Sequence, residues 1–269
     1  MKKHILITGG TAGIGKLAAM ELAKQGHDVS IHGRNKEKLE NTIDEIKEVT
    51  GNKNVRGFLA NFADLNAVRD MVEVIKSTVS KIDILINNAG VFKSSVDRNN
   101  DGLDVRFVVN YLAPYIVTNE LLEVLNVKGA RIINLSSAAQ ATVSLVQLAG
   151  KALITDNEAY AQSKLALTMW SFNLAKELEE AVVIAVNPGS LLDTRMAQEG
   201  YGQTWAPAEK GSNILVDLAL NSKYDHDSGK YFDNDKGEVK GYFAPAHADA
   251  YDLEKINELI EVTDSIINN

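Results

Sequence analysis

The chain has 269 residues, 45% of them hydrophobic and 24% charged, which is ordinary for a folded protein with a sizeable core. A formal net charge of −8 and a pI near 5.2 argue against broad binding to nucleic acid or to an anionic membrane, because both need a basic face. The sequence has no cysteine, which excludes disulfides and thiolate sites and favours a reducing, cytoplasmic setting. The histidines show no metal-ligand spacing, so we expect no metal site. We expect no signal peptide and no membrane span either, because no apolar run approaches about 18 residues.

Short apolar runs alternate with longer segments of helical character along the chain. The runs predict strands at about 4–8, 28–32, 55–59, 82–86, 130–135, 182–187 and 229–232. The segments between them predict helices at about 13–25, 36–50, 65–79, 103–126, 157–180, 207–221 and 251–267. This alternation predicts an α/β, doubly wound Rossmann fold, with one mostly parallel seven-stranded sheet and helices on both faces. No linker or repeat interrupts it, so we expect a single domain over 1–269, with a substrate-binding C-terminal segment at about 190–250.

A glycine-rich loop connects the first predicted strand to the first predicted helix. The strand ends at Thr8, and glycines follow at positions 9, 10, 13 and 15. A glycine can take backbone angles that side chains forbid, so the turn can be tight. The helix behind it offers unpaired N–H groups and a positive dipole end to a pyrophosphate. Alone, the loop is weak evidence, because a glycine-rich turn also occurs without a ligand.

Four further motifs follow in chain order at strand ends or on a helix. They are Asn87-Asn88-Ala89-Gly90, Ser136-Ser137, Tyr160-Ala161-Gln162-Ser163-Lys164 and Asn187-Pro188-Gly189. Residues i and i+4 of a helix share one face about 6 Å apart, which places Tyr160 and Lys164 together. Each motif alone is common in structural roles, as an Asn-Gly turn, a serine at a strand end or a chance YxxxK. Their joint order and spacing make chance a poor explanation.

In this order and spacing the chain resembles the short-chain dehydrogenase/reductase family, in its short, single-domain branch, and the resemblance covers nearly all of it. The glycine loop is similar to the family's TGxxxGIG rather than to the tighter GxGxxG of other Rossmann enzymes. The 22 residues between Ser137 and Tyr160, with Gly229-Lys230-Tyr231-Phe232, resemble the retinol-dehydrogenase-like group. The resemblance implies an oxidoreductase that interconverts a carbonyl and an alcohol with a nicotinamide cofactor. We expect the substrate to be a small molecule. If Val143, Leu145, Val146 and Leu148 line its pocket, an apolar substrate is favoured; the alternative is that these residues only pack the loop against the core.

The resemblance also implies roles for individual residues. The catalytic set is Asn110, Ser137, Tyr160 and Lys164. The cofactor-binding set is Gly9, Thr11, Gly13, Ile14, Gly15, Arg34, Asn35, Asn61, Phe62, Asn88, Ala89, Gly90, Tyr160, Lys164, Pro188, Gly189 and Thr194. Two positions depart from the family pattern. Asn61 stands where the family commonly has aspartate, and Thr194 comes one residue later than expected.

The end of the second predicted strand favours NADP(H) over NAD(H). Enzymes of this fold that prefer NAD usually place an acid there, which accepts from the ribose hydroxyls. Here the position holds Gly33, and Arg34 follows, whose guanidinium can bind a 2′-phosphate in bidentate fashion. The alternative for Arg34 is a solvent-exposed loop charge.

The chemistry that this set can perform centres on Tyr160. Reduction of a carbonyl builds negative charge on its oxygen, which must be hydrogen-bonded and protonated. The ordinary pKa of tyrosine, near 10, is too high for efficient exchange, and we expect Lys164 and the oxidised cofactor to lower it. Tyr160 is then the acid in reduction and the base in oxidation. By resemblance, Ser137 holds the substrate oxygen, and Asn110 with a water links Lys164 to solvent.

Residues 165–174 are apolar on nearly every side, so their helix must be covered on more than one face. The family's habit of pairing this helix across a subunit interface predicts a homodimer or homotetramer, and burial within one chain is the alternative.

Two other functions compete with the reductase. One is a non-catalytic NADP-binding regulator on the same fold, although such proteins usually lose the tyrosine, lysine or serine. The other is a sugar-nucleotide epimerase or dehydratase, for which the chain is short.

Overall fold

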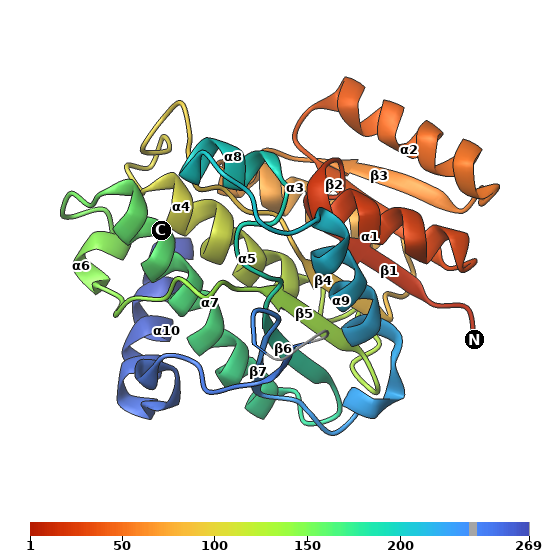
Figure 1. Cartoon of the computed structure of the whole chain (residues 1–269). Coiled ribbons are helices and arrows are strands. Elements are labelled where there is room, and N and C mark those ends of the chain that lie inside the picture. Colours follow the sequence, from red (N-terminus) through yellow and green to blue (C-terminus); the bar gives the residue numbers. More distant parts are fainter. Residues whose placement is uncertain (237–240, 269) are drawn as a thin grey trace.

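The computed structural model, which describes residues 1–236 and 241–268, contains one sheet of eight strands in the order β3-β2-β1-β4-β5-β6-β7-β8 (Figure 1). Seven parallel strands fall close to the predicted ranges: β1 (His4–Ile7), β2 (Asp28–Gly33), β3 (Val55–Leu59), β4 (Ile84–Asn87), β5 (Arg131–Leu135), β6 (Val182–Asn187) and β7 (Lys230–Asp233). The eighth, β8 (Tyr242–Phe243), pairs antiparallel with β7, so the predicted count of seven is corrected to eight among the described residues. Part of the predicted substrate segment, 237–240, lies outside them.

Helices cover both faces of the sheet, as predicted (Figure 1). One face packs against α1 (Gly13–Lys24), α2 (Lys36–Thr50) and α9 (Ala208–Leu220). The other face packs against α3 (Leu65–Thr78), α5 (Ala113–Glu120) and α7 (Asp156–Glu177). The central strands β1, β4, β5 and β6 are buried on both sides, which explains why they appear in the sequence as apolar runs rather than as alternating ones.

Side-chain caps set the starts of most long helices. Asn35 accepts from the Lys38 N–H at the start of α2, and Thr155 forms a capping box with Glu158 at the start of α7. The Asp252 side chain caps α10 (Leu253–Ile267) by accepting the N–H groups of Glu254 and Lys255. This helix therefore begins two residues later than predicted. Shorter helical turns fill the connections: α6 (Leu145–Leu148), α8 (Arg195–Tyr201), Ser222–Tyr224 and Ala248–Tyr251.

The helix predicted at 103–126 is shorter and less regular. It begins as α4 (Val105–Phe107), passes through a π-helical turn at Val108–Leu112 and continues as α5 to Glu120. Asn110 occupies the middle of the π turn and is fully buried. π turns inside α-helices often mark functional sites, because they redirect one side chain from the regular helix face. The irregularity therefore falls on a residue of the predicted catalytic set.

Helix α10 covers the apolar side of α7 within the chain. Met169, Trp170 and Phe172 are all buried without any second subunit. The hydroxyl groups of Tyr111 and Tyr115, which lie behind Trp170, bond to α10, the first to the Thr263 hydroxyl at 2.8 Å. The prediction that these side chains are buried between subunits is wrong, because α10 takes the place that a partner would fill. Self-association through another surface stays a prediction.

Among the described residues, every helix is too short or too polar to cross a membrane. The long connection before Tyr160 is held down by its own apolar residues. Leu148 is fully buried, and Val143 and Leu145 pack against the same core, whereas Val146 is exposed. Three of the four residues thus pack the loop down rather than line an open pocket.

Candidate active site

The predicted site residues gather at one edge of the sheet. The strand order reverses between β1 and β4, and ligands of doubly wound sheets bind beyond the carboxyl ends of strands at such a point. The predicted residues lie after β1, β2, β3, β4, β5 and β6, in the π turn, on α7 or at the start of α8. The topology therefore brings together motifs that are far apart in the sequence.

Thr8 and Asn88 join the glycine loop to the motif after β4. The Thr8 hydroxyl accepts the N–H groups of Asn88 and Ala89, both at 3.0 Å. The Asn88 amide donates to the carbonyls of Thr8 and Gly9, at 2.8 and 3.0 Å. A Cβ at Gly15 would lie only 2.3 Å from this amide, so only glycine fits there. The Asn88 segment thus supports the glycine loop through these bonds, whereas its predicted contact with the cofactor stays a prediction.

The start of α1 is left open toward the site. Ala12 precedes the helix in an extended conformation, with no side-chain cap, and the first turn carries no acid. Gly13 has a φ of +51°, in the left-handed region that favours glycine. A Cβ there would approach the Thr194 methyl at 3.5 Å, so Thr194 lies across the loop. These free N–H groups and the absence of a competing carboxylate fit the pyrophosphate of a dinucleotide.

His32, for which no pattern in the sequence indicates a function, supports the same loop from β2. Its Nδ1 accepts the Gly9 N–H at 3.1 Å, and its Nε2 lies 3.0 Å from the carbonyl oxygen of Ala60. This pair of partners fixes a neutral ring with the proton on Nε2. Phe62 stacks on the ring with centroids 3.9 Å apart. The Phe62 side chain is therefore buried against His32, and only its backbone is left for the predicted contact with the cofactor.

Acid should destabilise the protein through His32, because burial lowers the pKa of its imidazole to about 4. The unfolded chain takes up this proton near pH 6.5, before the folded protein does, so stability falls as the pH drops through the interval from 6.5 to about 4. The expected loss is about 2 kcal/mol between about pH 7.5 and about pH 5. Urea unfolding of the protein and of His32→Gln at both pH values measures it. An equal pH dependence in the two proteins would contradict this role.

Arg34 extends from the end of β2 and is exposed, with no ion pair within the described part of the chain. A Cβ at Gly33 would lie 2.5 Å from the Thr11 methyl, so an acid is not merely absent there but sterically disfavoured. Asn35 and Asn61 both use their side chains locally, Asn35 as the cap of α2 and Asn61 in a turn with the Ala63 N–H. These bonds use the side-chain oxygens of Asn35 and Asn61, so the predicted contacts with the cofactor must involve other atoms of these two residues.

Tyr160 and Lys164 lie one turn apart on α7, as the spacing predicts. The Lys164 ammonium is 5.6 Å from the centroid of the Tyr160 ring and donates to the carbonyl of Leu135 at 2.7 Å. Lys164 is only 4% exposed, and the carbonyl of Leu135 is the one hydrogen-bond partner of its ammonium group among the described residues. A buried ammonium with two further N–H donors is suited to binding hydroxyl groups of a ligand.

Burial sets the pKa values of this pair. It raises the pKa of Tyr160 to about 12, although a hydrogen bond from Ser137 acts in the opposite direction. It lowers the pKa of Lys164 to about 8, because its charged form loses hydration. The prediction that Lys164 lowers the pKa of Tyr160 is thus not met by the chain alone. The phenol is protonated at neutral pH, which is the form that an acid in carbonyl reduction requires.

Asn110 is placed close to Lys164, but its amide is already bonded to the backbone of Val91 and to the Ser163 hydroxyl. Its Oδ1 accepts the Val91 N–H at 2.8 Å, and its Nδ2 donates to the Val91 carbonyl and to Ser163 Oγ, both at 3.0 Å. A Cβ at Gly90 would lie 3.4 Å from Asn110 Oδ1 and 3.6 Å from the Lys164 ammonium. The Asn110 side chain therefore fixes the segment after β4 against α7. Its predicted role in a water relay stays a prediction.

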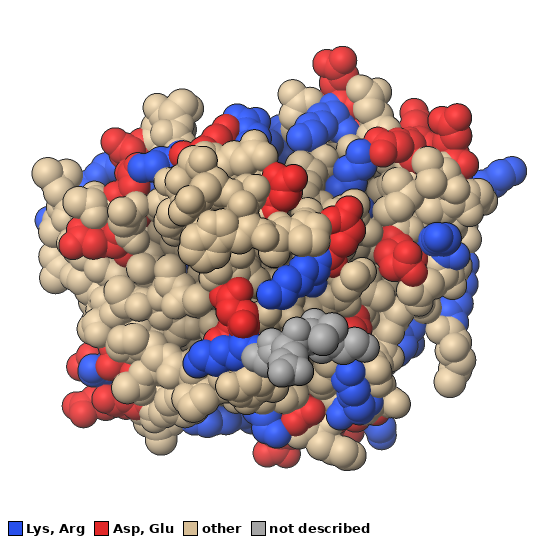
Figure 2. Space-filling model, viewed as in Figure 1, with Lys and Arg blue, Asp and Glu red and all other residues tan. Residues whose placement is uncertain are grey.

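An aromatic wall stands beside the Tyr160 ring. Phe92 packs edge-on against Tyr160, with centroids 5.0 Å apart, and Tyr201 of α8 stacks on Phe92 at 5.3 Å. Tyr201 and nearby Trp205 are 53% and 73% exposed. Figure 2 shows mostly uncharged surface over α8, among interspersed acidic and basic side chains. The wall is apolar and opens to solvent, as expected for the rim of a substrate site.

A buried arginine anchors this wall. Arg106 is 1% exposed and donates from Nε to the Phe92 carbonyl at 3.0 Å. Its other nitrogens pair with Asp104 at 3.1 Å and with Asp156, the first residue of α7, at 2.5 Å. The same guanidinium thus fixes Phe92 and the start of the helix that carries Tyr160. Neither Phe92 nor Arg106 belongs to a short motif, so no local signal in the sequence identifies them.

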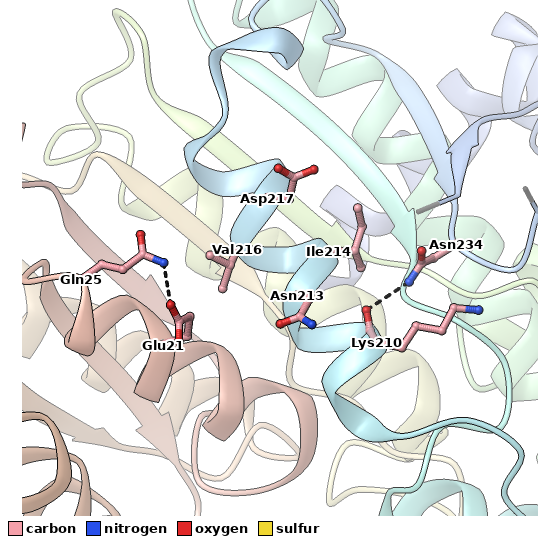
Figure 3. A pocket seen from close by; sticks show the side chains of 8 residues that line it. All are labelled: Glu21, Gln25, Lys210, Asn213, Ile214, Val216, Asp217 and Asn234. Atoms are coloured by element: carbon pink, nitrogen blue, oxygen red, sulfur yellow. Dashed lines mark hydrogen bonds between the residues drawn. The ribbon is translucent and has the colours of Figure 1, made fainter. Parts of the chain in front are cut away.

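A separate hollow of about 470 Å³ lies between α1 and α9 (Figure 3). Six of its eight lining residues are of polar or charged type, and the eight are Glu21, Gln25, Lys210, Asn213, Ile214, Val216, Asp217 and Asn234. Two hydrogen bonds within this lining, Gln25 to Glu21 and Asn234 to the Lys210 carbonyl, occupy part of its polar groups. None of the predicted site residues belongs to the lining, so this hollow is not the candidate active site.

The fold and this arrangement of residues are typical of dinucleotide-dependent oxidoreductases, and comparison with known sequences shows the family. Residues 3–204 match the short chain dehydrogenase family. Polyprenol dehydrogenase of Homo sapiens is 31% identical over 252 residues, which cover 86% of this chain and 76% of that protein. Retinol dehydrogenase 12 of Mus musculus is 33% identical over 248 residues, covering 87% and 78%. The chain belongs to the short-chain dehydrogenase family, and its likeness to retinol dehydrogenases is confirmed.

Solved structures share the fold. L-sorbose reductase from Gluconobacter frateurii, in complex with NADPH and L-sorbose, superposes with a TM-score of 0.69 at 23% identity. The superposition covers 89% of this chain and 97% of that chain. At this level of identity the likeness extends to the α/β architecture alone.

Proposed function

We propose that the protein is an NADP(H)-dependent oxidoreductase that interconverts a carbonyl and an alcohol, with Tyr160 as its acid and base. The observation that carries the proposal is the side-by-side position of the Tyr160 phenol, the Ser137 hydroxyl and the under-satisfied Lys164 ammonium, at the sheet edge that also carries the open glycine loop. A regulator without catalysis would have no need of this arrangement.

The roles follow from what each group can do. The cofactor supplies the hydride when it is bound. Ser137 Oγ accepts the Ala139 N–H, so its O–H is a donor, which bonds to Tyr160 in the chain alone and would turn to a substrate oxygen placed beside both groups. Tyr160, protonated at neutral pH, gives its proton to that oxygen as negative charge develops there. Lys164 is placed to hold ribose hydroxyls with its remaining donors and to favour the phenolate that forms.

Preference for NADP(H) is proposed from Arg34 and Gly33. Arg34 is exposed and unpaired within the described residues, so its guanidinium is available to a phosphate at no cost of a broken ion pair. The structural relative described above was solved with NADPH, which is in line with this choice but concerns that protein. Arg34 therefore carries the proposed preference for NADP(H). The Thr11 methyl lies next to Gly33 and leaves no room for an acidic side chain there.

The proposed substrate is a small carbonyl or alcohol compound with an apolar part next to the reacting group. Phe92 and Tyr201 form the wall beside Tyr160, and both present ring faces or edges rather than charges. The curated relatives are named for polyprenol and retinol, which are apolar alcohols, and those names concern the relatives. Apolar side chains next to the acid favour a substrate of that general character.

Replacement of Lys164 by methionine should impair both cofactor binding and turnover. Lys164→Met keeps most of the volume but removes the ammonium, and we expect kcat to fall by about 10²- to 10⁴-fold. The dissociation constant of NADPH should rise by about 10-fold, because hydrogen bonds to a charged group are lost. Steady-state kinetics and fluorescence titration measure the two effects. Unchanged NADPH affinity would show that Lys164 does not touch the cofactor.

The experiment that tests the proposed function is a panel of aldehydes, ketones and alcohols of increasing apolar size. NADPH oxidation is followed with the carbonyl compounds and NADP⁺ reduction with the alcohols. The proposal predicts turnover with at least one apolar member and faster turnover with NADPH than with NADH. Tight NADPH binding without turnover in either direction would favour the non-catalytic regulator instead.

Two further expectations from the sequence stay predictions. A cytoplasmic location was inferred from the absence of cysteine, and cell fractionation tests it. A homodimer or homotetramer was inferred from an apolar α7, whose apolar side α10 covers within the chain. Light scattering measures the mass in solution. A mass of two or four times 29.3 kDa would support an oligomer, formed through a surface other than the covered side of α7.

A further inference from the structure

Two side chains hold the carbonyl group of Ser137. Tyr231, on β7, donates its hydroxyl to this oxygen at 3.0 Å. Gln140 donates its side-chain amide to the same oxygen, also at 3.0 Å. The Gln140 oxygen in turn accepts the His247 N–H at 3.2 Å. The peptide of Ser137 is thus fixed by one donor from its own loop and by one from β7, two strands away from β5 in the sheet.

Ser137 needs such support because the sheet no longer holds its backbone. The β5–β6 ladder ends at the pair Leu135 and Val186, two residues before Ser137. Beyond this pair the chain turns, and Ser137 Oγ accepts the Ala139 N–H at 3.1 Å. The two donors to the Ser137 carbonyl therefore help to set the orientation of a turn that the sheet does not hold.

The effect of Ser137 on Tyr160 depends on that orientation. The hydrogen bond between them lowers the pKa of the phenol, as a donor to the phenolate does. Tyr231 is 4% exposed, and burial together with Asp233 and Asp235 raises the pKa of its phenol. Tyr231 therefore stays a donor over the working pH range and keeps its hold on the carbonyl.

We propose that Tyr231 is a positioning residue, which holds Ser137 through its carbonyl so that the Ser137 hydroxyl faces Tyr160. The inference rests on the proposed function, in which Ser137 and Tyr160 act together on the substrate oxygen. Tyr231 acts through Ser137 and does not itself touch the substrate. Phe232, the next residue of β7, points into the opposite core, so the phenol reaches the site because of strand alternation.

The test compares Tyr231→Phe with Tyr224→Phe. Both variants remove one buried phenol oxygen, but the Tyr224 hydroxyl bonds to Asp217 at 2.8 Å, away from the site. Tyr231→Phe should lower kcat by about 10- to 100-fold through misplacement of Ser137, with the KM for NADPH unchanged. In alcohol oxidation, the pH of half-maximal rate should rise by about half a unit or more, because the phenolate loses a donor. Tyr224→Phe should change neither value.

Crystal structures of the wild type and of Tyr231→Phe read the orientation independently of activity. The Ser137 hydroxyl should lie within hydrogen-bond distance of the Tyr160 oxygen in the wild type and turn away in the variant. An unmoved Ser137, or a kcat and pH profile that match those of Tyr224→Phe, would overturn the inference. If Ser137 turns as expected but the wild type oxidises and reduces nothing, the proposed function fails and the positioning role stands.

Discussion

Tyr160→Phe should lose almost all turnover and keep the fold. The substitution removes only the hydroxyl that donates the proton, and general acids contribute about 10²- to 10⁴-fold to the rate. The phenylalanine ring keeps the edge-on contact with Phe92. NADPH affinity should change by less than about 3-fold, because Lys164 and the glycine loop are untouched. Steady-state kinetics and NADPH titration on the same preparation measure both.

The control for Tyr160→Phe is Tyr224→Phe, which removes a phenol hydroxyl at a distance from the site. It should retain wild-type kcat. Retention of a large part of the activity by Tyr160→Phe on a substrate that the wild type turns over would refute the role of Tyr160. Loss of NADPH affinity along with activity would instead point to a damaged site, which thermal melting would reveal.

Arg34→Ala should separate the two cofactors. Hydrogen bonds to a charged group are worth about 1.5–3 kcal/mol, so the dissociation constant of NADPH should rise by about 10- to 100-fold. NADH lacks the 2′-phosphate, and its affinity should fall by less than about 3-fold. Arg34 has no ion pair within the described residues, so its loss should leave stability unchanged. Isothermal titration with both cofactors gives the comparison.

Lys36→Ala is the matched control for charge. Lys36 lies two residues further on, at the start of α2, where it forms an exposed pair with Glu40 at 3.9 Å. Its removal changes the net charge equally but should leave the ratio of NADPH to NADH affinity unchanged. Equal losses for both cofactors in Arg34→Ala, or a wild type that binds NADH more tightly, would defeat the assignment.

The sequence predicts the sheet and most of the site because both depend on local patterns. Parallel strands buried on two faces appear as apolar runs, and seven of them were found within a few residues of their bounds. Motifs at the carboxyl ends of such strands come together by topology, so Ser137, Tyr160 and Lys164 could be placed without coordinates. The two-residue strand β8 has no periodic pattern and was missed.

The contacts that the sequence did not predict are those between distant segments. Tyr231 and Ser137 are 94 positions apart, and no spacing rule connects them. His32 appears in the sequence as an ordinary histidine in a strand, although its ring supports the glycine loop. The sequence predicts that α7 is apolar and buried, but no pattern in it predicts that α10 covers this helix. Amphipathic patterns show that a face is buried, and only the tertiary structure shows by what.

The most direct test of this function is isotope transfer from NADPH that carries deuterium at both positions of the reactive carbon of its nicotinamide. The protein is incubated with this cofactor and the apolar carbonyl panel, and the products are analysed by mass spectrometry. The account predicts one deuterium on the alcohol carbon for each NADP⁺ formed, and almost none with Tyr160→Phe. Tight binding of the labelled cofactor with no deuterium in any product, or equal transfer by Tyr160→Phe, would contradict it.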